Sequence, residues 1–324
     1  MINLDKMQYS AILKLRVCDL VLTLPRDKKD QIKQLSTLLR QHKIAWTPHI
    51  WLADEWFSPD GVAGFALPFV LGHKKLITLE KKYLGYCEGE TPSEFLKLCC
   101  HETGHALDNA YKLRLSKSRQ QLFGKSSTQY PNSYSPDPNS NEYVSFLKDF
   151  YAQAHPDEDW AETFAYVLTH TNWHKSYANS VALKKLNFVK HTLSQLKEKP
   201  YKQDKMKMPL HFKKDTRTVE SYLLDKKREL KIDRKTFFSS HLKTHIVPFK
   251  LTSQHKKNIV TSVAIKTKIN SWYIEKCLQE LNQECKKKQF RLDYNQLNSQ
   301  VKIEKLISTS IHEFIQQGRT RIYM

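Results

Sequence analysis

The feature that most constrains this chain is the pentapeptide His101-Glu102-Thr103-Gly104-His105. Residues four apart on an α-helix lie one turn apart on the same face, so His101 and His105 can direct ring nitrogens at one Zn²⁺ ion. Glu102 lies beside them, where a carboxylate could take a proton from a metal-bound water. The pentapeptide therefore predicts a helix that carries two metal ligands and a general base.

The residues before the pentapeptide support this helix. The segment Thr91-Pro92-Ser93-Glu94 combines an N-cap Thr, a Pro at the first helical position and a Glu three residues after the cap. An apolar run that includes Cys99 and Cys100 then leads into the motif. Adjacent helical residues project about 100° apart, so at most one of these thiols could face the metal. We predict that both cysteines pack in the core.

A second helix is predicted downstream, where Pro156 suits a first helical position and Asp157 and Asp159 place negative charge at the helix N-terminus. Glu158 and Glu162 share one face of this helix because they are four residues apart. They could be solvated surface charges, since charged helix faces are common. After a His-Glu-x-x-His motif, we instead expect them to supply a third zinc ligand and a carboxylate that supports the ligands.

These segments carry a resemblance to a known family. The residues concerned are Leu15–Leu20, Trp51–Gly61, His101–Tyr111 and His155–Ala165. They resemble the bacterial putative zinc-binding metallopeptidase family and, more distantly, the gluzincins, which include the anthrax lethal factor peptidase. The resemblance implies a zinc peptidase in which Glu158 is the third ligand. It also implies that Tyr151, seven residues before Glu158, polarises the scissile carbonyl.

Hydrophobic patterning predicts an α+β fold, in which a domain with a small sheet and helices precedes a mostly helical domain. The resemblance implies that the first domain is zincin-like, with the active site on its helices. Apolar and aromatic runs favour strands at 44–52, 64–71 and 76–79, and helical spacing recurs at 27–43, 219–230, 271–287 and 301–317. The Lys-rich stretch 197–217, with two prolines, places the expected boundary between a peptidase domain, 1–200, and a basic accessory domain, 201–324. In a zincin, Gly64–Phe69 could be an edge strand that holds substrate backbone; an ordinary core strand is the alternative.

Two further residues and one loop are candidates for a role at the site. Asp108 lies three residues after His105 and could accept the spare N–H of a ligating His, although it could also be a surface Asp near the helix end. Gly104 costs the helix roughly 1 kcal/mol relative to Ala, which indicates that another backbone or the substrate approaches there. The polar loop 121–141 could carry Tyr130 or Tyr134 towards substrate, or it could be padding.

Charge and composition limit the partners. The net charge is +20, and residues 201–324 hold 27 Lys and Arg against 12 Asp and Glu. This basic C-terminal segment could bind nucleic acid weakly, although its lysines are scattered and no zinc-finger or RNP signature accompanies them. Six cysteines without C-x-x-C spacing predict reduced thiols in a cytoplasmic protein. No apolar run reaches about 18 residues, so we expect no membrane span.

The leading hypothesis is a zinc-dependent metallopeptidase that acts on protein or peptide substrates. One Zn²⁺ would be held by His101, His105 and Glu158, with Glu102 as general base and Tyr151 assisting at the carbonyl. The alternatives are a nucleic-acid-associated protease of the Spartan type and a non-catalytic, zinc-stabilised binding module. Glu102 argues against the binding module, because a structural zinc site needs no base beside the metal.

Overall fold

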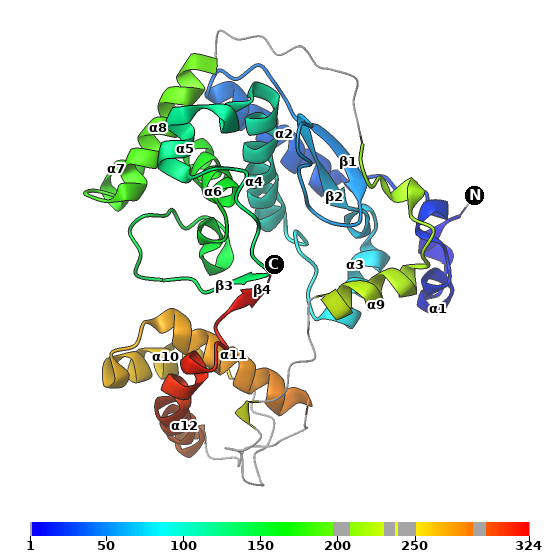
Figure 1. The fold of residues 1–324 in the computed structure, drawn as a ribbon. Coiled ribbons are helices and arrows are strands. Elements are labelled where there is room, and N and C mark those ends of the chain that lie inside the picture. Colours follow the sequence, from blue (N-terminus) through cyan, green and yellow to red (C-terminus); the bar gives the residue numbers. More distant parts are fainter. Residues whose placement is uncertain (1, 197–207, 230–236, 239–250, 288–295, 324) are drawn as a thin grey trace. The chain divides into compact units, whose positions relative to one another are not determined.

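The computed structural model describes residues 2–196, 208–229, 237–238, 251–287 and 296–323 (Figure 1). The chain divides into two compact units. The first comprises Met1–Pro131 and Asn141–Ile232, and the second comprises Asn132–Ser140 and Asp233–Met324. Helices dominate both units and the strands are short, which confirms the predicted α+β class.

The first unit consists mainly of helices around one pair of strands. Its elements are η1 (Leu4–Lys6), α1 (Tyr9–Leu13), η2 (Val17–Asp19), α2 (Arg26–Gln41), β1 (His49–Ala53), β2 (Gly64–Pro68), η3 (Phe69–Gly72), α3 (Lys74–Leu84), α4 (Pro92–Tyr111), η4 (Leu113–Leu115), α5 (Lys117–Phe123), η5 (Lys148–Gln153), α6 (Pro156–Thr169), α7 (Trp173–Ser176), α8 (Val181–Leu196), η6 (Phe212–Lys214) and α9 (Val219–Glu229), where η denotes a 3₁₀ helix.

Strand β2 lies inside the unit. It pairs in parallel with β1, from His49 opposite Gly64 to Ala53 opposite Pro68. On its other side the Ala66 amide donates to the Phe57 carbonyl at 2.8 Å, and all five residues of β2 are buried. The burial of the whole strand and the contact of Phe57 with its other side at Ala66 favour the core-strand alternative for this segment.

The strand expected at 76–79 is wrong, because these residues lie in helix α3. Leu76 and Leu79 are buried, and a run this short does not distinguish strand from helix by its period. The decisive signals lie at the ends of the helix. The His73 ring accepts a hydrogen bond from the Lys75 amide as an N-cap, and Gly85 ends the helix with φ +89°.

Helices α4 and α6 form as their local signals predict. Thr91 caps α4 by accepting a hydrogen bond from the Glu94 amide at 3.2 Å, and Pro92 occupies the first turn. His155 caps α6 through its ring Nδ1, which accepts from the Asp157 amide at 3.1 Å. Most of both helices is buried, including the residues of the His-Glu-x-x-His motif in α4 and Glu158 and Glu162 in α6.

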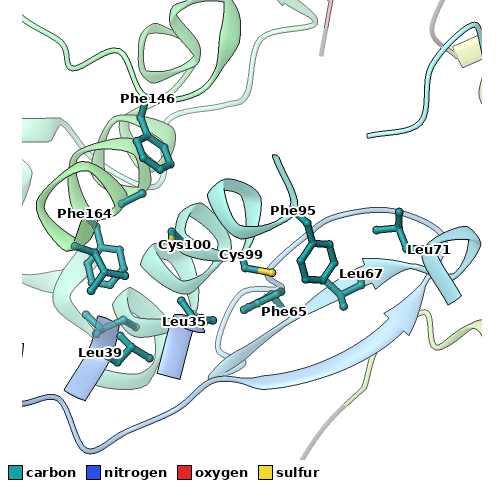
Figure 2. Close-up of a cluster of buried hydrophobic side chains, with 14 of the residues drawn as sticks. Leu35, Leu39, Phe65, Leu67, Leu71, Phe95, Cys99, Cys100, Phe146 and Phe164 are labelled. Carbon is teal, nitrogen blue, oxygen red and sulfur yellow. The ribbon is translucent and has the colours of Figure 1, made fainter. Parts of the chain in front are cut away.

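Helix α4 runs through the hydrophobic core (Figure 2). Phe65 and Phe95 lie near Cys99 on the side that faces the strands, and Phe164 of α6 lies on the opposite side of α4. Cys99 and Cys100 are fully buried among these side chains, as predicted. The core thus holds α4 between the sheet and α6.

The expected boundary between residues 200 and 201 lies in the stretch 197–207, outside the described residues, and the division into 1–200 and 201–324 stays a prediction. Helix α9 belongs to the first unit. Its residues Val219, Tyr222 and Leu223 are buried in the same core as α4. The first unit therefore extends beyond residue 208.

The second unit contains α10 (Ser253–Thr267), α11 (Ser271–Lys287), α12 (Gln296–Gln316) and an antiparallel pair, β3 (Ser133–Tyr134) with β4 (Ile322–Tyr323). Its separate core is formed by apolar faces of the three helices, including Ile259, Ile274 and Ile307. None of the helices in the described ranges has the length and apolar content needed to cross a membrane.

Candidate metal centre

Three donor atoms converge in the first unit. The His101 Nε2 lies 3.0 Å from the Glu158 Oε2, and the His105 Nε2 lies 3.2 Å from each of these two atoms. All three residues are buried. Ligands about 2.0 Å from a tetrahedral zinc ion are about 3.3 Å from one another. The three atoms therefore have the spacing of one face of a zinc tetrahedron, and the donor set of two imidazoles and a carboxylate fits that metal.

The crossing of α4 and α6 brings these donors together. At the crossing, a Cβ added to Gly104 would lie 2.9 Å from the Ala161 Cα. The Trp160 indole N–H donates to the Gly104 carbonyl at 2.9 Å. Of the two explanations for Gly104, close approach of another backbone is the correct one. Glu158, in the first turn of α6, thereby reaches the histidine face of α4.

The electrostatics of the three side chains are mutually dependent. Burial lowers the pKa of His101, but its hydrogen bonds with Glu158 and Glu162 outweigh burial and hold that pKa well above its usual value. Burial raises the pKa of Glu158, but the neighbouring His105 and His101 outweigh it and hold that pKa well below its usual range. The carboxylate and the two rings thus form a polar cluster that a cation would complete.

Glu162 supports His101 from the side opposite Glu158. Its Oε1 lies 3.1 Å from the His101 Nδ1, and its Oε2 accepts from the backbone amides of Phe146 at 3.1 Å and Leu147 at 2.9 Å. A ring whose Nδ1–H donates to Glu162 presents an unprotonated Nε2 to a metal. Glu162 is therefore in a position to hold the proton of His101 on Nδ1 and leave Nε2 free for a metal.

A pocket of about 340 Å³ opens onto these residues. It is lined by Trp56, Phe57, Ser58, Asp60, His101, Glu102, His105, Arg114, Tyr130, Tyr151 and Glu158. Within the described part of the chain, the buried Glu102 Oε2 has no hydrogen-bond partner. Burial raises the pKa of this carboxyl, an effect that His101 and His105 oppose. A buried acceptor beside the donor cluster requires a polar partner, such as a water molecule bound in the pocket.

Comparison with known proteins agrees with this geometry. A family model described as "Putative zinc-binding metallo-peptidase" matches residues 95–261, slightly more than half of the chain. The chain belongs to this metallopeptidase family. The matched region includes the three residues that carry the donor atoms and begins in the first turn of α4. No curated protein and no solved structure matches the chain.

In this member of the family, Tyr151 lies in η5 and lines the pocket beside the donor cluster. Its ring centroid is 5.7 Å from that of His101. The two preceding residues, Asp149 and Phe150, have φ values of 62° and 55°. Non-glycine residues in this left-handed region cost roughly 1–2 kcal/mol each, so the surrounding structure imposes an unusual turn immediately before Tyr151.

Asp108 does not have the contacts expected of it. Its Oδ2 accepts from Arg119 at 3.1 Å and from Arg114 at 3.3 Å, and its Oδ1 has no partner among the described residues. The hydrogen bond from His105 that the sequence suggested is not among its contacts. Arg119 also donates to Asp157 at 2.6 Å. Asp108 thus belongs to a buried ionic network that joins α4, α5 and the start of α6.

Several residues that line the pocket are not predicted by the sequence. Arg114 lines the pocket and pairs with the exposed Asp60, and no local pattern predicts such a long-range pair. Trp56 and Phe57 form an aromatic part of the wall. Of the two loop tyrosines considered, Tyr130 lines the pocket, whereas Tyr134 is in strand β3 of the second unit.

Proposed function

We propose that this protein is a peptidase in which one Zn²⁺ is held by His101, His105 and Glu158. The observation that carries the proposal is the spacing of their three donor atoms, 3.0–3.2 Å, beside the pocket. Catalytic zinc sites have three protein ligands and keep one position for water or substrate, whereas structural sites have four. In the described parts of the chain, the cluster that could hold a metal contains these three residues.

Glu102 is the proposed general base. Bound zinc would supply a Lewis acid that lowers the pKa of a water molecule and polarises a carbonyl. Glu102 lines the same pocket, and its buried Oε2 is the acceptor that would take the proton of this water. The same carboxyl would then pass the proton to the leaving amine. A carboxylate in this place supports the hypothesis of an enzyme over that of a non-catalytic binding module, because a structural zinc site needs no base beside the metal.

Tyr151 is the proposed donor to the oxygen that gains negative charge in the transition state. Its place in the pocket wall, beside the His101 ring, supports this role. A phenol O–H can stabilise an oxyanion by a hydrogen bond, and such donors act most strongly where water is excluded. Trp56 and Phe57 in the same wall would help to exclude water around the reacting carbonyl.

Hydrolysis by matched metal-loaded proteins tests this function. The wild type and Glu102→Gln would each be loaded with one zinc ion and incubated with an unstructured protein and a mixed peptide library, and the products read by mass spectrometry. We expect the wild type to cleave peptide bonds, to stop when a chelator removes zinc and to recover when zinc is restored. Glu102→Gln should keep its zinc and lose cleavage. Equal cleavage by both proteins, or none by the zinc-loaded wild type against any substrate in the library, would contradict the proposal.

A further inference from the structure

The two carboxylate oxygens of Glu158 have different partners. Oε2 lies 3.0 Å from the His101 Nε2 and 3.2 Å from the His105 Nε2. Oε1 accepts a hydrogen bond from the Tyr130 hydroxyl at 2.9 Å. One oxygen therefore belongs to the donor cluster, and the other is engaged by a phenol from the loop that joins the two ligand helices.

The different partners of the two Glu158 oxygens determine whether Glu158 can bind a metal through one oxygen or through both. A carboxylate can bind a cation through one oxygen or through both. If both oxygens of Glu158 bound zinc, the second would compete with water for the remaining position. We propose that Tyr130 is a positioning residue that restrains Glu158 to single-oxygen binding and so keeps that position open. This inference rests on the proposed function, because an open position matters only if the zinc is catalytic.

The orientation of Tyr130 is fixed by the start of helix α6. Its ring stacks on the His155 ring, with centroids 3.6 Å apart and planes 13° from parallel. The His155 Nε2 lies 2.8 Å from the Thr128 carbonyl oxygen, and its Nδ1 accepts from the Asp157 amide at 3.1 Å. These contacts define one tautomer, in which Nε2–H donates and Nδ1 accepts.

His155 thus caps helix α6 and also stacks on the ring of Tyr130. His155 is the N-cap of α6, and Glu158 follows three residues later in the first turn of that helix. A shift of Tyr130 relative to Glu158 would have to break the ring stack or the cap. Tyr130→Phe removes only the hydroxyl and leaves a ring that can stack on His155. The substitution therefore separates the hydrogen bond to Glu158 from the packing of the loop.

Cobalt substitution measures the coordination number directly. Wild type, Tyr130→Phe and Tyr151→Phe would each be loaded with one Co²⁺, whose visible absorption bands are stronger with four ligands than with five. We expect strong bands from the wild type and from Tyr151→Phe, which leaves the Glu158 hydrogen bond intact. Tyr130→Phe should give weaker bands, and X-ray absorption of its zinc form should show one additional oxygen ligand.

Steady-state kinetics of Tyr130→Phe test the role of Tyr130 independently of the spectra. Loss of a group that orients a metal ligand typically costs about 10- to 100-fold in metal affinity or activity. For Tyr130→Phe we expect a fall of this size in kcat with KM little changed, because the open position serves the reaction and not the binding of the peptide. A merely structural role would instead lower the thermal stability and leave the cobalt spectrum unchanged.

Three outcomes would overturn the inference. One is a Tyr130→Phe spectrum equal to that of wild type, with the same number of zinc–oxygen contacts. Another is a wild-type site in which both Glu158 oxygens already bind the metal, a measurement that needs no variant to fold. The third is a wild type that binds no metal, which would also contradict the proposed function. A wild type that cleaves peptides with four-coordinate metal but is unaffected by Tyr130→Phe would refute the role of Tyr130 alone.

Discussion

Gly104 of α4 faces Ala161 of α6 so closely that a Cβ on Gly104 would lie 2.9 Å from the Ala161 Cα. Real Cβ atoms essentially never approach a backbone atom this closely. The Trp160 indole bonds to the Gly104 carbonyl across the same crossing. The glycine inside the His-Glu-x-x-His pentapeptide therefore sets the distance at which Glu158 reaches the two histidines.

Gly104→Ala should accordingly destabilise the protein and weaken zinc binding. In an exposed helix the change would be favourable by about 1 kcal/mol, whereas overpacking a core costs about 1–3 kcal/mol. We expect a lower Tm by differential scanning fluorimetry and a higher Kd for zinc in a chelator competition. Ser93→Ala, on the exposed first turn of the same helix, is the control and should change neither by much. A Gly104→Ala protein as stable as wild type would show that the crossing has room to adjust.

Substitution of Glu158 and substitution of Glu162 in α6 should have different effects on zinc binding. Glu158→Ala removes the oxygen nearest both histidines and should leave the protein without stoichiometric zinc. Glu162→Ala removes a partner of the His101 Nδ1 and should retain zinc with an affinity about 10- to 100-fold lower. Elemental analysis and chelator competition measure both quantities. Zinc-replete Glu158→Ala beside zinc-free Glu162→Ala would exchange the proposed roles.

Asp108→Asn should affect folding more than metal binding. Asp108 and Arg119 are both fully buried, and removing one charge of a buried pair typically costs about 3–5 kcal/mol. We expect a lower free energy of unfolding in urea, measured on zinc-free protein, with little change in zinc affinity. Asp30→Asn, in an exposed pair with Lys33, is the control and should cost about 1 kcal/mol or less. If zinc affinity fell while zinc-free stability held, Asp108 would be a residue that orients a ligand.

Tyr151→Phe should slow turnover and leave the zinc content and the fold intact. Removal of a single donor to an oxyanion costs about 10²- to 10³-fold in kcat. Steady-state kinetics on the best peptide from the library, with zinc content and Tm measured on the same preparation, make the comparison. Unchanged kcat would exclude Tyr151 from the transition state.

The parts of the fold that sequence predicts well are those with local signals. The caps of α4 and α6 are encoded by adjacent residues, and the side chain of Thr91 makes the contact expected of it. The composition of the short apolar run at 76–79 predicts a strand, but the run is helical, and the signals that begin and end this helix lie outside it at His73 and Gly85. The membership of Asn132–Ser140 in the second unit depends on residues far away in the chain, such as those of β4.

The candidate site shows the same distinction. Helical spacing placed Glu158 and Glu162 on one face, but their separate contacts with the two nitrogens of His101 depend on how α6 crosses α4. The sequence leaves open whether Asp108 contacts a histidine or lies on the surface, and its contact with Arg119 of another helix fits neither alternative. Contacts between elements, which a single sequence does not display, decide both cases.

Weak nucleic-acid binding by residues 201–324 stays a prediction from charge, as does the cytoplasmic location. In residues 208–229, several cations have contacts within the first unit. Lys226 pairs with Glu80 at 2.6 Å, and Lys213 donates to the Leu20 carbonyl at 2.6 Å. Cations held in this way are less available to phosphates, and neutralised phosphates are what make such binding strong and sensitive to salt.

Anomalous diffraction at the zinc edge, from crystals of the zinc-loaded wild type, would show which atoms bind the metal. We expect one anomalous peak, about 2.0–2.2 Å from the Nε2 atoms of His101 and His105 and from one oxygen of Glu158, with a water molecule in the fourth position. A peak at another place in the chain, a metal bound by Glu162 in place of Glu158, or a fourth protein ligand in the position of the water would contradict this expectation.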